Sequence, residues 1–162
     1  MDNIMMNEGR MKRNFFAKII LFTRVKRSTI VEIICYLFIL LFVYAAVSKI
    51  IDYKNFRVQI GKSPLLTFFP DLVAIVVPTI ELIIALALAS VRARLVGLYA
   101  SFSLMILFTA YIAAITNFSD YIPCSCGGVL QHMTWNQHLI FNIFFVVMGA
   151  VGVLLHDTSK LK

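Results

Sequence analysis

Charged side chains are scarce in this chain of 162 residues, because they make up 14% of the sequence whereas hydrophobic types make up 60%. A soluble domain carries roughly a quarter charged residues. So few charges cannot cover a water-facing surface, and lipid must therefore be the main solvent of this chain. Four membrane spans of about 20 residues would use roughly half of the sequence, which leaves little length for a separate soluble domain.

Cysteine and acidic residues are also few. Three cysteines exclude a disulfide-dense scaffold. Fifteen Lys and Arg against eight Asp and Glu give a net charge of +7. Because the basic residues lie beside apolar runs, we expect the lipid bilayer and its anionic headgroups as partners, and no nucleic acid.

Four apolar runs predict membrane spans at about residues 29–51, 70–90, 95–116 and 135–156. Pro70 suits the first turn of the second span, and Pro78 should kink that span. Thr134 and Gln137 fit a capping box at the start of the fourth span. The predicted fold class is all-α, a polytopic membrane protein with a four-transmembrane-helix bundle over residues 29–156 and a tail over 157–162.

The first 28 residues are polar and basic, with apolar residues at helical spacing. This pattern predicts an N-terminal interfacial amphipathic helix lying on the membrane surface. A signal peptide is the alternative, but the apolar run that follows is too long for a signal sequence. The apolar residues of the predicted helix are Phe15, Phe16, Ile19, Ile20 and Phe22.

The basic residues are distributed unequally between the two sides of the predicted bundle. One side has seven in the N-terminal segment, two between spans two and three (Arg92 and Arg94) and two in the tail. The other side has four, all in or beside the loop after span one. The positive-inside rule predicts a bacterial-type inner membrane protein with both termini cytoplasmic and the 117–134 loop extracytoplasmic.

Two cysteines on that loop, Cys124 and Cys126, form the most specific motif, in the sequence Pro123-Cys-Ser-Cys-Gly127-Gly. Cysteines one residue apart can bridge only in a tight turn, because disulfide geometry restricts the Cα separation. Such a bridge stabilises little, since the loop that it closes is tiny, and it should be labile. The spacing favours a redox pair, and an inert pair in a turn is the structural alternative.

Metal binding is the third interpretation of the loop. Cys124, Cys126, His132 and Met133 lie close together in the sequence, and His138 follows. Soft thiolates with imidazole or thioether ligands suit Cu(I) or zinc, although zinc favours a wider cysteine spacing. For both histidines, hydrogen bonding to water or headgroups at the interface is the favoured alternative.

Glu81 is predicted near the middle of the second span, where an ionisable group is costly and suggests a function by default. One interpretation is a proton path or a quinone headgroup site, built with nearby polar residues and coupled to the thiols. These polar residues are Tyr44, Ser48, Lys49, Thr79, Thr109, Tyr111 and Asn142. The favoured alternative is interhelical hydrogen bonding, with Glu81 neutral or paired to Lys49. Glu32 should snorkel or pair near Arg27. Cys35, in the first span, is interpreted as a small buried apolar side chain.

Three stretches together resemble the DoxX-like membrane family, and within it the branch of the methylamine utilisation protein MauE. They are Tyr44 to Asp52, Val77 to Leu82, and Pro123 to Gly128 followed by Trp135 and Asn142. The resemblance covers about residues 30–155. This chain differs in the residue between the cysteines, in the Gly-Gly that follows them and in its long basic N-terminus.

The resemblance implies a four-helix membrane protein in thiol handling or maturation of exported proteins, with a quinone as electron acceptor in the wider group. The expected activity is extracytoplasmic thiol–disulfide exchange by Cys124 and Cys126, with Glu81 in a secondary role. A relay needs a second dithiol, which this chain lacks. Either a partner such as an exported thioredoxin-like protein or thiol client supplies it, or the pair passes electrons straight to a cofactor. The alternatives are a non-enzymatic assembly factor, a copper-handling site and, less favoured, a small-solute transporter.

Overall fold

The computed structural model describes residues 2–62, 68–118 and 134–157. The helices in this part of the chain are α1 (Asp2–Ile51), α2 (Tyr53–Lys62), α3 (Pro70–Ala89), α4 (Arg94–Phe118) and α5 (Trp135–Asp157). Four of them are long and apolar enough to cross a membrane, over Arg27–Ile51, Pro70–Ala89, Arg94–Asn117 and Trp135–His156. The all-α, four-span prediction is confirmed, and the ends of these apolar helical segments lie within two residues of the ends predicted for the spans.

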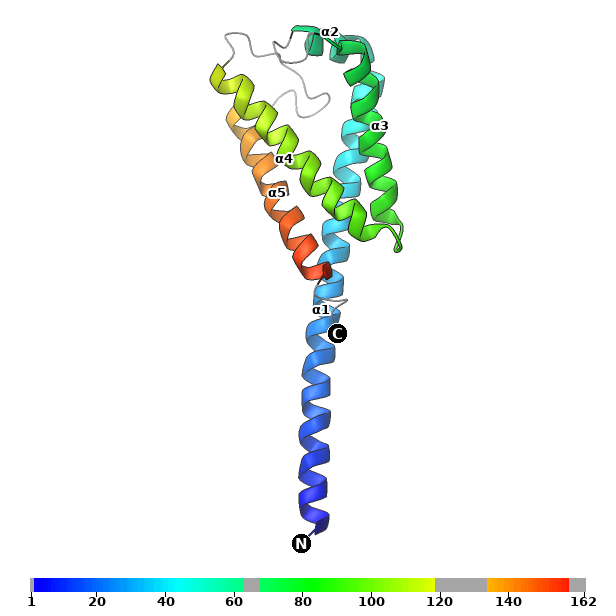
Figure 1. Ribbon diagram of the computed structural model, residues 1–162, viewed down its shortest axis with the longest axis vertical. Helices are drawn as coiled ribbons and strands as arrows, with labels where there is room; N and C mark the ends of the chain where they lie inside the picture. The colour runs from blue at the N-terminus through cyan, green and yellow to red at the C-terminus, as the bar shows by residue number, and fades with distance from the viewer. Residues whose placement is uncertain (1, 63–67, 119–133, 158–162) are drawn as a thin grey trace.

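Helix α1 is continuous over 50 residues and extends well beyond the other helices (Figure 1). The helix therefore runs without a break through residue 28, the predicted boundary between the basic segment and the first span. The N-terminal segment is helical, as predicted, but it continues the direction of the first span instead of turning away from it. Its position on the membrane surface stays a prediction.

The spanning helices form a ring in which α1 contacts α3 and α5, and α4 contacts the same two neighbours. At the end of the bundle where α3 joins α4, the two pairs α1/α3 and α4/α5 lie close together, and they diverge toward α2 (Figure 1). We call these the inner and outer ends, after the predicted orientation. The outer end carries α2, a short helix in the loop after span one that the sequence analysis did not predict.

The inner and middle parts of the bundle are tightly packed. Phe38 of α1 is fully buried and stacks on Phe42 at 5.7 Å between ring centroids. The Phe38 ring also meets Phe145 of α5 edge to face at 5.4 Å, an arrangement that aromatic pairs prefer. Cys35 is 3% exposed in the same core, which confirms it as a small buried side chain.

Two glycines permit the close approach of helices at the inner end. A Cβ at Gly97 of α4 would lie 2.9 Å from the backbone nitrogen of Leu88 in α3. A Cβ at Gly152 of α5 would lie 3.1 Å from the Leu98 side chain and 3.2 Å from Ile34. Nearby, Glu32 pairs with Arg94 at 3.8 Å, whereas the sequence analysis placed it near Arg27. Gly97 therefore lets the backbones of α3 and α4 approach closely, and Gly152 leaves room for side chains of α1 and α4.

Helix α2 packs on the outer end of α3. Phe56 and Ile60 of α2 are buried against Ala74 of α3. Arg57 pairs with Asp71 through two guanidinium nitrogens, one of which lies 3.0 Å from Oδ2. That pair is more than half exposed and adds little stability, so burial of the two apolar side chains holds α2 in place.

Replacing Gly97 by alanine should destabilise the protein by roughly 1–3 kcal/mol, because the new methyl group meets backbone and cannot be relieved by a rotamer change. Gly61→Ala is the matched control, since its Cβ would lie 3.8 Å from Pro70, an ordinary contact. Thermal unfolding in detergent measures the melting temperature of each purified variant. Equal melting temperatures for the two variants would contradict the close approach.

Candidate functional site

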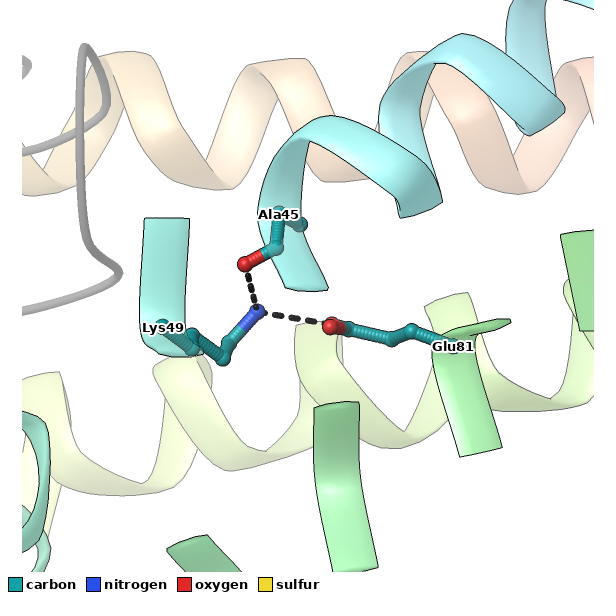
Figure 2. Close-up of polar contacts among 3 residues, drawn as sticks. All are labelled: Ala45, Lys49 and Glu81. Atoms are coloured by element: carbon teal, nitrogen blue, oxygen red, sulfur yellow. Dashed lines mark hydrogen bonds and ion pairs between the residues drawn. The ribbon is translucent and has the colours of Figure 1, made fainter. Parts of the chain in front are cut away.

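A buried ion pair joins the first two spans. Nζ of Lys49, in the last turn of α1, lies 2.7 Å from Oε1 of Glu81 in α3 (Figure 2). Lys49 is 7% exposed and Glu81 is fully buried. The ammonium group also donates a 3.4 Å hydrogen bond to the carbonyl oxygen of Ala45, one turn earlier in α1. The pairing that the sequence analysis favoured for Glu81 is present.

Two aromatic rings lie near the Lys49 ammonium group. Its ammonium nitrogen lies 5.9 Å from the ring centre of Phe56 and 6.0 Å from that of Phe108. A cation within about 6 Å of an aromatic ring centre is attracted by the negative face of the ring. The ammonium group of Lys49, on α1, is therefore close to side chains of α2, α3 and α4.

The outer half of the bundle contains a cavity of about 370 Å³ beside this ion pair. Its walls come from all five helices and most of its lining side chains are apolar. Small-molecule sites in proteins span roughly 300–1,000 Å³, so the volume suits a ligand with one or two rings. The polar or amphipathic residues of the lining are Lys49, Gln59, Glu81, Tyr111, Trp135, His138 and Asn142.

The hydrogen bonds at the start of α5, the fourth span, position one side of the cavity. The backbone N–H of Thr134 donates to Oε1 of Gln137 at 2.9 Å, and the Gln137 N–H donates to the Thr134 hydroxyl at 3.4 Å. This reciprocal pair confirms the predicted capping box. It begins α5 so that Trp135, His138 and Asn142 follow on the face that lines the cavity.

The structure brings together only some of the polar residues that the sequence analysis grouped. Glu81, Lys49, Tyr111 and Asn142 line the cavity. Thr79 is instead exposed on the bundle surface, where its hydroxyl donates to the carbonyl oxygen of Ile75 at 2.7 Å. The hydroxyl of Thr109 donates in the same way to the carbonyl oxygen of Met105 at 2.7 Å.

Two cavity residues were missed or misplaced by sequence reasoning. Gln59 was missed because it lies on α2, which was not predicted. His138 was interpreted as an interfacial histidine facing water or headgroups, but it is 6% exposed and lines the cavity. Its position four residues after Thr134 in a helix was the available signal, because it places His138 about one turn inside the bundle.

The predicted redox pair Cys124 and Cys126, and the alternative metal ligands His132 and Met133, lie outside the described residues. Their loop joins α4 to α5, and side chains near both of its ends line the cavity. Ile115 precedes the loop and Trp135 follows it. The cavity is therefore next to the two points at which the cysteine loop is attached.

The family model described as methylamine utilisation protein MauE matches residues 27–155. No curated protein matches, and no solved structure matches. The matched range begins at the first membrane span and ends in the last turns of the fourth, so the basic N-terminal part of α1 lies outside it.

Breaking the Lys49–Glu81 pair from either side should be strongly destabilising. Lys49→Met and Glu81→Leu should each lower the free energy of unfolding by roughly 3–5 kcal/mol, because each leaves a buried charge without its partner. The double variant should recover most of that loss, since no charge remains. Lys54→Met on the exposed face of α2 is the control and should change stability by less than about 0.5 kcal/mol.

Denaturant unfolding in detergent measures all four variants as a double-mutant cycle. Additive losses in the double variant would show that the two residues act independently, which contradicts the pair.

Proposed function

The chain belongs to the family of the methylamine utilisation protein MauE, and we propose that it acts as a membrane protein of extracytoplasmic thiol–disulfide exchange during maturation of exported proteins. The exchanging pair in this proposal is Cys124 and Cys126. The observation that carries it is the attachment of the Cys-Ser-Cys loop, whose flanking residues Ile115 and Trp135 line a membrane-embedded cavity. In this proposal the thiols lie outside the membrane, on a loop whose points of attachment adjoin a site that a membrane-soluble molecule can enter.

The chemistry proposed for the pair is a two-step exchange. A client thiolate attacks one sulfur of a Cys124–Cys126 disulfide, and the other sulfur leaves as a thiolate. The second client thiolate then displaces the first cysteine, so that the client is oxidised by two electrons and the pair is reduced to two thiols. Short spacing favours this direction, because a strained disulfide is the better oxidant.

Reoxidation of the pair needs an acceptor of two electrons. A quinone is the class that the family resemblance suggests, and a partner protein with its own dithiol is the other. Glu81 is the proposed proton-handling group, because its carboxylate lies in the cavity wall between the membrane interior and the loop attachment. Its contact with Lys49 supports the interhelical role more directly, so proton handling is secondary in this proposal.

Thiol labelling in intact cells should show the pair as an exposed, reducible couple. A membrane-impermeant maleimide should add two labels after mild reduction and none before it. Cys124→Ser and Cys126→Ser should each abolish oxidation of exported client thiols, and one of the two should accumulate a mixed disulfide with its client. Cys35→Ser is the matched control and should behave as wild type, since Cys35 is buried in the core.

A pair that stays unlabelled both before and after reduction would refute the exposed redox couple. Unchanged disulfides in exported proteins of the two serine variants would favour a non-enzymatic assembly role instead. Stoichiometric copper in the purified protein that is lost in Cys124→Ser would favour the copper-handling alternative.

A further inference from the structure

The cavity contains buried polar atoms that have no hydrogen-bond partner within the described part of the protein. They are Oε2 of Glu81, Nδ2 of Asn142 and Oε1 of Gln59, and all three residues line the cavity. A buried polar atom without a partner costs roughly 1–3 kcal/mol. Unpartnered atoms gathered in the lining of one cavity favour a bound molecule that supplies partners to two of them, Oε2 of Glu81 and Nδ2 of Asn142.

The ion pair uses only one of the two carboxylate oxygens of Glu81. Glu81 uses Oε1 to accept from Lys49 at 2.7 Å, and Oε2 remains available as an acceptor. Nδ2 of Asn142 is a donor, and this residue is 4% exposed. A single ligand group that served both atoms would donate one hydrogen bond and accept another. A hydroxyl group does both, whereas a carbonyl group would leave the carboxylate oxygen unsatisfied.

The charge of the ligand follows from the same pair. Lys49 and Glu81 already balance each other, and both are at least nine-tenths buried. An ionised ligand would bring an uncompensated charge into the bundle, at a cost of several kcal/mol or more. The ligand class is therefore uncharged.

The rest of the lining favours a flat ring. Aromatic side chains from three spans and from α2 surround the cavity, among them Phe56, Phe108, Trp135 and Phe141. Aromatic walls pack well against a ring, in stacked or edge-to-face contact. A water cluster fits less well, because buried waters need two to four polar partners each and most of this wall is apolar.

We propose that the outer-half cavity is a binding site for an uncharged, membrane-soluble ring compound with a hydroxyl group, of the phenol or hydroquinone class. The hydroxyl donates to Oε2 of Glu81 and accepts from Nδ2 of Asn142, and the ring lies among the aromatic side chains. The proposal concerns binding only and contains no redox step. It therefore stands or fails separately from the cysteine chemistry.

Trp135 provides the readout, because it lines the cavity and is the only tryptophan of the chain. Two bromine-containing probes of matched shape, which quench nearby indole fluorescence, are 4-bromophenol and 4-bromotoluene. Titration into the full-length protein in lipid nanodiscs should give saturable quenching with 4-bromophenol. The half-saturating concentration of 4-bromotoluene should be roughly 5–10-fold higher than that of 4-bromophenol. A difference of this size corresponds to the net free energy of one or two hydrogen bonds.

Asn142→Leu tests the hydrogen-bonding end of the site without breaking the ion pair. It should raise the half-saturating concentration of 4-bromophenol roughly five-fold and leave that of 4-bromotoluene unchanged, since only the phenol uses the amide. Asn117→Leu is the matched control, because this exposed asparagine donates to the carbonyl oxygen of Ala113 and does not line the cavity. It should leave both titrations as in wild type.

Non-saturable quenching by both probes, unaffected by Asn142→Leu, would overturn the proposal, because it would mean partitioning into lipid alone. Equal saturable binding of both probes would overturn the hydroxyl assignment. The same titration on Cys124→Ser separates the two proposals, because binding should be unchanged there. If the protein binds 4-bromophenol selectively but its cysteines do not react, the thiol exchange is refuted and the binding site is supported.

Discussion

The Lys49–Glu81 ion pair is the interaction on which the arrangement of the outer half depends. It fixes the end of α1 against the middle of α3 at 2.7 Å, and the charge of Lys49 also lies near aromatic rings of α2 and α4. A buried pair of this kind is weak evidence for net stability, because desolvation offsets much of the attraction. Its value here is geometric. It places a carboxylate of the cavity lining inside the second span and leaves one of the carboxylate oxygens without a hydrogen-bond partner.

The helices pack differently at the two ends of the bundle. At the inner end, Gly97 and Gly152 let helices approach until a methyl group would meet backbone or neighbouring side chains. At the outer end, the helix pairs diverge and large side chains line the space between them (Figure 1). Membrane helices associate through close packing and polar contacts, since lipid is as apolar as their side chains. Close packing therefore holds the inner end, and polar contacts hold the outer end around a cavity.

Much of this fold could be predicted from the sequence because its signals are local. Hydropathy marks the spans, and Thr134 with Gln137 marks the start of α5, as the hydrogen bonds confirm. Glu81 stood out because a carboxylate in an apolar run needs a partner. Helix α2 was missed because its stability comes from contacts of Phe56 and Ile60 with α3, which no local pattern encodes. For the same reason the cavity could not be predicted. Its lining joins residues from five helices, and His138 looks interfacial until α5 is placed in the ring.

The same pair constrains how the protein enters the membrane. A charge at the centre of a lone spanning helix costs roughly 2.5–3.5 kcal/mol on insertion scales. The second span carries Glu81 at such a depth, and its partner Lys49 is already in the chain when that span leaves the ribosome. Insertion of the first two spans together, as a helical hairpin with α2 at its tip, neutralises both charges before either is exposed to hydrocarbon. In that order of insertion, α4 and α5 would complete the cavity against an α1/α3 hairpin whose charges are already paired.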